Sequence, residues 1–418
     1  MRIKIKPVVP RGQVKAIASK SDAHRAIICA ALSDESTKIH ISHISKDIQA
    51  TLNCIKAMGA DYINKNGIYE ILPIKNLAEN PVLDCGESGS TVRFLLPVLS
   101  ALNCDATFIG SGRLPERPLK PIVDLLKEHQ KEFSSEKLPL TVSGKMKSGE
   151  FNISGNVSSQ FISGLLFALP LLSDNSIIKL TSSLQSSAYV DMTIDTLKAF
   201  GQEIKRTVDS FEVTPIKRYI SPKEYIVEGD WSNAAFFMVM GALGGDLTIK
   251  NLSMKSYQSD KRILEILNLA GVKTEASENE IKVYKSDIKP FDYDVSQCPD
   301  LFPVMAILAC GANGKTTLYN AERLRIKESD RIKTTKELIL NLGGFAEETE
   351  SSLEIYGKGR LAGGNVNSAN DHRIAMSAFV SSAICEKDII LENALAIDKS
   401  YPTFVEDFKS IGGKADVI

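Results

Sequence analysis

The sequence predicts a mixed α/β (α+β) fold of two similar lobes, each made of three repeats of strands and helices. The first observation behind this prediction is a repeat: six amphipathic helix-like segments, each followed by a short strand-like stretch, end about 70 residues apart along the 418-residue chain. The second is that helix candidates between them are apolar on nearly all sides, as fully buried helices are. A solenoid is the alternative, but repeats of this length more often form compact subdomains.

The amphipathic segments end in a consistent way. A helix commonly closes through a left-handed residue just past its last turn, and glycine adopts that conformation without steric cost. The second segment has His129 at this place, and the other five have a glycine, at Gly59, Gly201, Gly271, Gly343 and Gly412. Because these positions divide the whole chain evenly, we expect six equivalent units.

Most units are also expected to contain a buried helix. The candidates begin with residues that cap helices and then run apolar, over 21–32, 90–102, 158–172, 232–243, 300–311 and 371–384. Strand-like stretches follow, including 37–42, 248–253, 316–321 and 388–394. The unit is therefore expected to be strand–helix–strand–helix–strand. The stretch 219–230 lies just past mid-chain and is the best single boundary between two lobes with a cleft between them.

The composition excludes several classes of protein. Fifty basic residues nearly balance 51 acidic residues, so the surface as a whole gives no reason to expect binding to nucleic acid or to an anionic membrane. The N-terminus lacks the apolar stretch of a signal peptide, and the longest apolar run, 236–243, is too short to span a bilayer. The seven cysteines are dispersed without a CxxC pair, so we expect a cytoplasmic protein without a disulfide framework.

One motif match is rejected. Residues 309–316, ACGANGKT, satisfy the loose pattern of a phosphate-binding loop. Such a loop needs a strand before it and a helix after it, so that the helix N-terminus faces the phosphates. Here the helix-like stretch 300–311 comes before and the strand-like stretch 316–321 comes after. A helix-to-strand turn is therefore the better interpretation.

Other segments place small polar and basic residues at the start of a buried helix, at 19–25, 86–93 and 158–160. Exposed backbone N–H groups and the helix dipole make such a start a potential anion site. Taken alone, each segment is more often a simple helix cap. Their recurrence in equivalent units favours a cluster that binds anions.

Cationic residues are concentrated in further segments, at 112–118, 323–331 and 370–373, and at Lys399. Arginine binds phosphate and carboxylate groups through a planar fork of donors. The run 323–331 by itself also fits a solvated helix face, but the segments together indicate a ligand with several anionic groups. No histidine pair has the spacing of metal ligands, so no metal site is expected.

In this order the motifs resemble those of the 3-phosphoshikimate 1-carboxyvinyltransferase family over essentially the full length. They are SKSxxxR at 19–25, ESGSTxR at 87–93, RxxxRP at 113–118, SSQF at 158–161, SSAYxD at 186–191, PD at 299–300, RxKESDR at 325–331, NDHR at 370–373 and Lys399. The resemblance implies one lobe of residues 19–229 and another of 1–18 with 230–418. Each would hold three βαβαββ repeats around buried parallel helices, and substrates would bind in a cleft that closes.

The resemblance also implies an activity. This family transfers the carboxyvinyl group of phosphoenolpyruvate to the 5-hydroxyl of shikimate 3-phosphate and releases phosphate, in the shikimate pathway that leads to chorismate and the aromatic amino acids. Both substrates are polyanions, which suits a cationic site. No cofactor or metal is required. The implied protein is a cytoplasmic monomer whose partners are these two small molecules, with neither nucleic acid nor membrane.

The resemblance assigns residues to each substrate. For shikimate 3-phosphate they are Lys20, Ser21, Arg25, Ser158, Ser159, Gln160, Ser186, Asp300 and Lys327. For phosphoenolpyruvate they are Lys20, Gly89, Arg117, Gln160, Arg331, Arg373 and Lys399. Of the catalytic set, Asp300 would accept the proton of the attacking hydroxyl and Glu328 would protonate and deprotonate the vinyl methylene. Lys20 and His372 would assist.

Some residues depart from the usual family pattern. Ala18 stands where a glycine often precedes SKS, and Ser90 stands where the family usually has threonine. Glu87 replaces the usual asparagine, and its carboxylate must turn away from the anion or pair with a cation such as Arg93. Arg323 stands where the family often has asparagine.

Two alternatives stay open at this point. The sister enolpyruvyl transferase, which acts on UDP-N-acetylglucosamine, carries a reactive cysteine on a loop that here reads SGRLPERP, without cysteine. The other is a non-catalytic sensor of a phosphorylated sugar acid. Such a sensor would need the cations more than the carboxylates Asp300 and Glu328.

Overall fold

The computed structural model describes residues 1–156 and 158–418, and it divides into two compact units. Unit 1 consists of Met1–Ile17 and Glu228–Ile418, and unit 2 consists of Ala18–Val227. The chain therefore begins in unit 1, passes through the whole of unit 2, and returns to unit 1. The boundaries expected from the resemblance are 18/19 and 229/230.

One sheet topology recurs throughout the described part of the chain. In each four-stranded sheet the first two strands are parallel, and the third is antiparallel to both of its neighbours. The second repeat shows the order of elements along the chain, which is β6, α3, β7, α4, β8, β9. The mixed α/β class and the repeat are thereby confirmed. The unit is βαβαββ, one strand longer than the strand–helix–strand–helix–strand pattern of the residues alone.

Unit 2 has three such sheets among its described residues. In spatial order they are β14 (Glu224–Ile226), β3 (Thr37–His40), β5 (Ile68–Leu72) and β4 (Asp61–Lys65); β6 (Val82–Asp84), β7 (Ala106–Ile109), β9 (Leu140–Gly144) and β8 (Lys131–Phe133); β10 (Glu150–Ile153), β11 (Ser176–Leu180), β13 (Ser210–Val213) and β12 (Lys205–Arg206). Its helices are α1 (Lys20–Ala31), α2 (Lys46–Ala57), α3 (Gly89–Ala101), α4 (Lys120–Glu128), α5 (Ser159–Ala168) and α6 (Ser187–Ala199).

Unit 1 repeats the arrangement, and both chain ends lie in one of its sheets. In spatial order the sheets are β2 (Gly12–Lys15), β15 (Leu247–Lys250), β17 (Glu280–Val283) and β16 (Thr274–Ala276); β18 (Asp292–Asp294), β19 (Asn313–Tyr319), β21 (Leu353–Lys358) and β20 (Ala346–Glu348); β22 (Gly364–Asn367), β23 (Ile389–Glu392), β1 (Arg2–Ile5) and β24 (Ala415–Val417). Its helices are α7 (Trp231–Gly244), α8 (Ile263–Leu269), α9 (Phe302–Cys310), α10 (Arg331–Asn341), α11 (His372–Ser381) and α12 (Phe404–Ser410).

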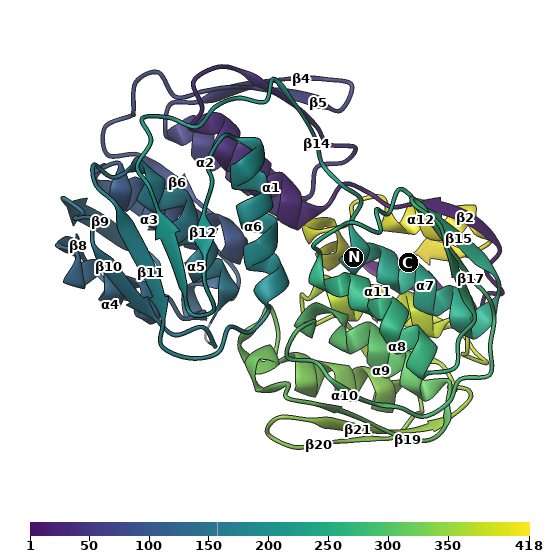
Figure 1. The fold of residues 1–418 in the computed structure, drawn as a ribbon. Coiled ribbons are helices and arrows are strands. Elements are labelled where there is room, and N and C mark those ends of the chain that lie inside the picture. The colour runs from purple at the N-terminus through teal and green to yellow at the C-terminus, as the bar shows by residue number, and fades with distance from the viewer. Residues whose placement is uncertain (157) are drawn as a thin grey trace. The chain divides into compact units, whose positions relative to one another are not determined.

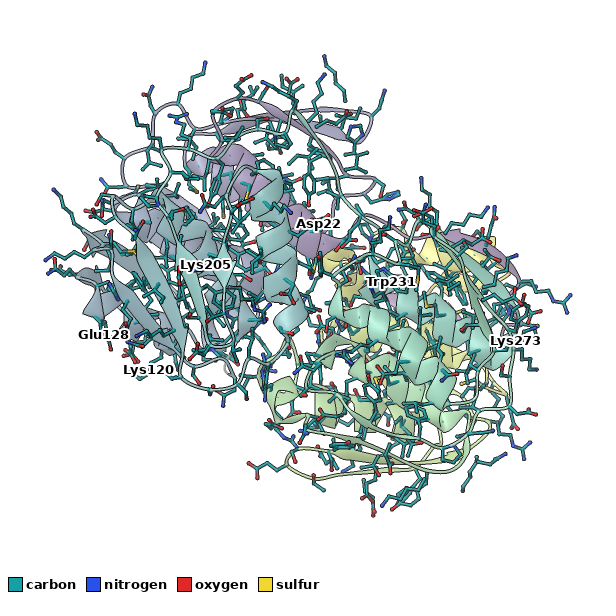
Figure 2. The ribbon with its side chains drawn as sticks, in the orientation of Figure 1. Asp22, Lys120, Glu128, Lys205, Trp231 and Lys273 are labelled. Atoms are coloured by element: carbon teal, nitrogen blue, oxygen red, sulfur yellow. The ribbon has the colours of Figure 1, made fainter. Side chains whose placement is uncertain are left out.

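The apolar helices form the centre of each unit. In unit 1, α7, α9 and α11 contact one another (Figure 1), and every residue of α9 is buried. In unit 2, α3 contacts both α1 and α5. Trp231 is fully buried at the start of α7, whereas charged residues such as Lys205 and Lys273 are exposed (Figure 2). Within the described ranges, no helix combines the length and the apolar character needed to cross a membrane.

The helix ends follow the predicted rule, with one correction. Gly59, Gly201, Gly271, Gly343 and Gly412 all have positive φ just past a helix. In the second repeat, however, His129 is the last residue of the helix end, with φ −96°, and Gln130 adopts the left-handed conformation, with φ 70°. The equivalent position is therefore 130 rather than 129. The sequence hid it because the residue there is not a glycine.

The rejected phosphate-loop match is confirmed to be a helix-to-strand turn. Helix α9 ends at Cys310 and strand β19 begins at Asn313. The order of the two elements is the reverse of that in a phosphate-binding loop.

Gln130→Gly is expected to raise the unfolding free energy of unit 2 by about 0.5–1 kcal/mol, because glycine adopts the left-handed conformation without the cost that a side chain adds. Gly412→Ala is the matched control in unit 1. Its φ is 96° and a β-carbon there meets nothing within 4 Å, so a loss of about 1–2 kcal/mol would be purely conformational. Hydrogen exchange in increasing urea reports each unit separately. A Gln130→Gly variant no more stable than the parent would contradict the assignment.

Candidate functional site

The first turn of α1 holds a lysine against a carboxylate. Ser19 caps the helix by accepting a hydrogen bond from the backbone N–H of Asp22. Lys20, the first residue of the helix, donates from Nζ to Oδ2 of Asp47 at 2.8 Å. The lysine charge is thus held in place at the helix start by a residue of α2.

Arg25 lies one turn further along α1 and is buried. Its guanidinium donates to Oγ1 of Thr193 at 2.8 Å and to the backbone carbonyls of Ser21 and Tyr189. Burial lowers the pKa of Arg25 to about 10, which still leaves the group charged at neutral pH. Neutral acceptors therefore orient this cation without cancelling its charge.

Two guanidinium groups lie over the first turn of α3, which Ser88 caps. A β-carbon at Gly89 would lie 2.7 Å from Nη1 of Arg117 and 2.8 Å from Nη1 of Arg93, so glycine is required for both to approach. Arg93 also donates to Oε1 of Gln160 at 2.8 Å. Helix N–H groups and two cations at one place make an anion site.

The starts of α5 and α6 supply polar groups. Ser158 caps α5 by accepting from the backbone N–H of Gln160, and Ser159 is buried. Gln160 donates from Nε2 to Oγ of Ser90 at 2.9 Å. Ser186 is buried in a left-handed conformation, with φ 54°, which costs a residue with a side chain about 1 kcal/mol and is typical of functional sites.

In unit 1, Asp300 is surrounded by cations. Its Oδ1 lies 2.7 Å from Nη1 of Arg331 and 3.8 Å from Nζ of Lys327, and its Oδ2 lies 3.0 Å from Nη2 of Arg373. Arg373 also donates to the backbone carbonyl of residue 300, at 3.1 Å. Three cations from Lys327, Arg331 and Arg373 therefore converge on this one carboxylate.

Arg331 is the centre of the cluster and is 2% exposed. Its Nε donates to Oδ2 of Asp371 at 2.8 Å, and the same oxygen accepts from Oγ of Ser329. Burial opposes the charge of Arg331, but Asp371, Asp300 and Glu328 outweigh burial and raise its pKa. The run 323–331 is therefore not simply a solvated helix face, because its last arginine is buried.

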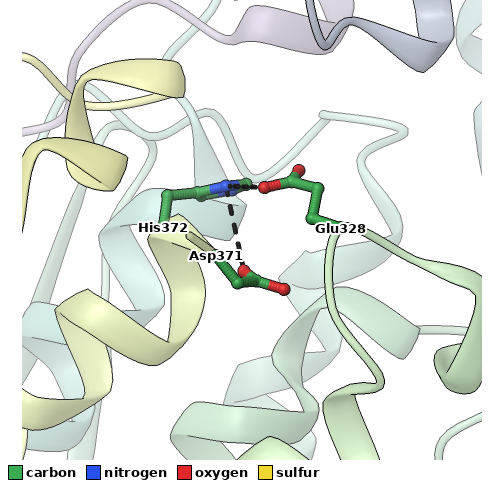
Figure 3. Close-up of side chains that lie close together, drawn as sticks. All are labelled: Glu328, Asp371 and His372. Carbon is green, nitrogen blue, oxygen red and sulfur yellow. Dashed lines mark hydrogen bonds and ion pairs between the residues drawn. The ribbon is translucent and has the colours of Figure 1, made fainter. Parts of the chain in front are cut away.

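His372 and Glu328 form a second pair, with Nδ1 and Oε2 2.7 Å apart (Figure 3). Together with Asp371 they lie close enough to share a cation, with ligand atoms within 4.8 Å of one another. Both oxygens of Asp371 already accept from the guanidinium of Arg331, however, and a metal ion would have to compete with that buried charge. We therefore interpret the cluster as an ion-pair network.

Lys399 is buried and donates from Nζ to the backbone carbonyl of Asn370 at 2.6 Å. Two consecutive residues before α11, Ala369 and Asn370, have positive φ, 51° and 57°. This turn aims the carbonyl of Asn370 at the lysine. It also places Lys399 beside the segment that contains His372 and Arg373.

Asp260 is a buried carboxyl that the sequence did not indicate. Burial, followed by the charge of Asp300, raises its pKa to about 6, although the charge of Arg373 and the hydroxyl of Ser232 oppose the rise. Asp260 therefore responds to the charge of the cluster around Asp300.

The structure groups the predicted residues by unit. In unit 2, the predicted residues at the helix starts or within reach of them are Lys20, Ser21, Arg25, Gly89, Arg117, Ser158, Ser159, Gln160 and Ser186. Those linked by contacts in unit 1 are Asp300, Lys327, Glu328, Arg331, His372, Arg373 and Lys399. Arg323 is mostly buried, which lowers its pKa despite the charges of Glu322 and Asp300. The carboxylate of Glu87 lies against Gly112.

Sequence reasoning missed Arg93, Asp371 and Asp260 as site residues. Arg93 follows Gly89 by four residues, so helical spacing could have placed both on one face. Asp371 occupies the capping position directly before His372, where a carboxylate is usually taken for a cap alone. No pattern in the sequence distinguishes Asp260 from a surface aspartate.

Cations at helix starts in unit 2, and cations paired with carboxylates in unit 1, are typical of an enzyme that acts on small polyanions. The fold supports this class. The EPSP synthase from Acinetobacter baumannii superposes with a TM-score of 0.83 at 26% identity over 100% of both chains. The enolpyruvyl transferase NikO from Streptomyces tendae has a TM-score of 0.81 at 14% identity, covering 99% and 98% of the two chains, and shows the fold alone.

The sequence comparisons identify the family. A sequence model of EPSP synthase (3-phosphoshikimate 1-carboxyvinyltransferase) matches residues 5–408, and the chain belongs to this family. A 3-phosphoshikimate 1-carboxyvinyltransferase of Clostridium kluyveri is 45% identical over 99% of this chain and 98% of its own length. One of Clostridioides difficile is 41% identical over the same shares.

Membership of the family fixes the reaction. The protein is a transferase that moves the carboxyvinyl group of phosphoenolpyruvate to shikimate 3-phosphate, in the shikimate pathway of aromatic amino-acid biosynthesis. The comparisons favour neither the UDP-N-acetylglucosamine enolpyruvyl transferase nor the sensor.

Asp260→Asn is expected to change how the stability of unit 1 depends on pH. Between the ordinary pKa of 3.8 and the raised value of about 6, folded Asp260 keeps a proton that the unfolded chain releases. Its contribution to stability therefore falls as pH rises through this window, by on the order of 1.4 kcal/mol per pH unit. Between pH 4 and pH 7, the unfolding free energy of the variant should rise by roughly 2–3 kcal/mol relative to that of the parent. Urea unfolding at several pH values checks this, and parallel profiles would contradict it.

Proposed function

We propose that the cations at the helix starts of unit 2 and the ion-pair cluster of unit 1 are two halves of one active site. The observation that carries the proposal is the complementary chemistry of the halves. Unit 2 offers helix N–H groups, hydroxyls and cations, whereas unit 1 adds the carboxylates that a proton transfer needs. The carboxylates proposed to move protons, Asp300 and Glu328, both belong to unit 1.

Phosphoenolpyruvate would bind at the arginine and lysine side chains assigned to it in the two units. In unit 2 that place is the first turn of α3, under Arg117 and next to Gln160, with Lys20 from α1. In unit 1 it is the set of Arg331, Arg373 and Lys399. Arginine forks bind a phosphate and a carboxylate in defined orientations, so the substrate would be held with its C2 atom in a fixed position.

Shikimate 3-phosphate would bind the hydroxyl-rich helix starts. Its phosphate suits Ser158, Ser159 and Ser186, and its carboxylate suits Arg25. The residues assigned to this substrate also include Lys20, Ser21, Gln160, Asp300 and Lys327. Hydroxyl and amide donors of this kind give directional recognition of a polyol.

The two carboxyl groups, those of Asp300 and Glu328, would carry out the proton transfers. Asp300 would take the proton of the 5-hydroxyl as its oxygen attacks C2 of phosphoenolpyruvate, while Glu328 donates a proton to C3. Glu328 would then recover a proton from the new methyl group as phosphate leaves, which restores the double bond. His372, 2.7 Å from Glu328, holds that carboxyl, and Lys20 assists. The surrounding arginines would stabilise the tetrahedral intermediate.

We also propose that the enzyme works as a monomer in the cytoplasm. The seven cysteines are all free thiols, which fits a reducing compartment, and each unit buries its own apolar core. Sedimentation at several protein concentrations tests the monomer, and a mass of twice 45.7 kDa would refute it.

Arg117→Ala and Lys399→Ala are expected to lower kcat/KM for phosphoenolpyruvate by about 100-fold or more, because each removes a charge-assisted contact with the substrate anion. Lys120→Ala is the control, since this exposed lysine pairs with Asp124 and Glu136 on the surface. It should stay within about twofold of the parent. The rate of phosphate release, measured while the concentration of each substrate is varied, gives these kinetic constants. Parent-like kinetics would remove that residue from the site.

Shikimate 3-phosphate is expected to protect the two connections near residues 17–18 and 227–228 from limited proteolysis, because closure of the units on the substrate would bury them. Digestion is followed by mass spectrometry with and without the substrate. Unchanged cleavage at both connections would speak against closure.

A further inference from the structure

A row of buried hydrogen bonds connects three helices of unit 2, from α1 through α2 to the N-terminal cap of α3. Nδ1 of His24, in α1, lies 2.7 Å from Oγ1 of Thr51, in α2. Oγ1 of Thr51 lies 2.7 Å from Oγ1 of Thr91, in α3, and that hydroxyl donates to Oγ of Ser88 at 2.7 Å. Each of these side chains is at most 1% exposed. The row therefore runs from α1 to the cap of α3 without contact with water.

The direction of the row can be deduced from its last bond. A hydroxyl has one proton, and that of Thr91 is donated to Ser88. Thr51 must then donate to Thr91, and Nδ1 of His24 must donate to Thr51. His24 is therefore the Nδ1–H tautomer, and it is the origin of the row.

His24 is also held neutral. Burial, with the charges of Lys20 and Arg25 on the same helix, lowers its pKa well below the ordinary value. Its Nε2 accepts no hydrogen bond from the described residues. The imidazole is thus fixed by its Nδ1 donor alone, in the helix whose first turn carries Lys20.

The far end of the row is the cap of α3. Ser88 Oγ accepts both from Oγ1 of Thr91 and, at 3.3 Å, from the backbone N–H of the same residue. Gly89, which lies between these two residues in the chain, is under the guanidinium groups of Arg93 and Arg117. Whatever fixes the hydroxyl of Thr91 therefore also fixes the first turn on which these arginines rest.

We propose that His24 is a positioning residue for phosphoenolpyruvate: through Thr51 and Thr91 it holds the cap of α3, and with it the anion site at Gly89, in register with α1. This inference rests on the proposed function, which seats the substrate anion at that turn. A displacement of the turn by a fraction of an ångström would misalign both arginines, and such misplacement lowers substrate use without removing any ligand.

The test compares variants that keep or remove one hydrogen bond. His24→Asn retains a donor at the Nδ1 position and is expected to raise KM for phosphoenolpyruvate less than threefold. His24→Ala and Thr91→Val, which break the row at opposite ends, should each raise it about tenfold, with kcat changed less. Thr91→Ser, which keeps the hydroxyl, should restore the parent KM. Thermal unfolding of every variant separates these effects from a loss of stability.

A double variant shows whether the two ends act through one row. His24→Ala combined with Thr91→Val should have the KM of either single variant, because a row broken once is already broken. Multiplication of the two effects, or a His24→Asn variant as impaired as His24→Ala, would overturn the inference. The proposed function is judged separately: if Arg117→Ala raises KM and the His24 variants do not, only the role of His24 fails.

Discussion

Positively charged side chains must be held close to one another before any anionic substrate binds, and both units meet this constraint. Arg331 shows it most clearly: a guanidinium that is 2% exposed is stable only because Asp371 and Asp300 lie within hydrogen-bond distance. Lys20 is held in the same way by Asp47. The carboxylates are therefore part of the anion site, because they offset the solvation that the buried cations lose and the repulsion between those cations.

The two units satisfy this constraint differently. In unit 2 the caps of α1, α3 and α5 are the neutral side chains Ser19, Ser88 and Ser158, so the positive end of each helix dipole stays available to an anion. In unit 1 the caps of α10 and α11 are Asp330 and Asp371, which already neutralise the helix starts. Unit 1 must therefore present its charge through side chains, and it holds Arg331 and Arg373 around Asp300 for this purpose.

The fold could be predicted because the residues that mark its repeat each have a single structural explanation. A glycine that closes an amphipathic segment, as Gly201 and Gly343 do, indicates a left-handed helix end, and α9 can be apolar on all sides only if it is buried. The helix end at Gln130 was not recognised because a polar residue can adopt the same left-handed conformation at a modest cost. The additional strand of the repeat was missed because the two strands after the second helix are short; β12, for example, has two residues, which is too short a pattern to detect.

Site residues could be predicted where a charged residue belongs to a sequence motif. They could not be predicted where the residue's chemical properties depend on burial in the folded protein. Lys20, Arg117 and Lys399 are cations wherever they lie, so the sequence could name them. Asp260 becomes unusual only through desolvation, and Asn370 acts through a backbone carbonyl that any residue possesses.

The same limit applies to backbone strain. Ser186, Ala369 and Asn370 are left-handed without being glycine, at a cost of about 1 kcal/mol each. Ser186, at the start of α6, is itself a proposed substrate contact, and Ala369 and Asn370 precede α11, which carries Arg373. The strain thus positions a hydroxyl or a carbonyl, and the packed core of each unit sustains it.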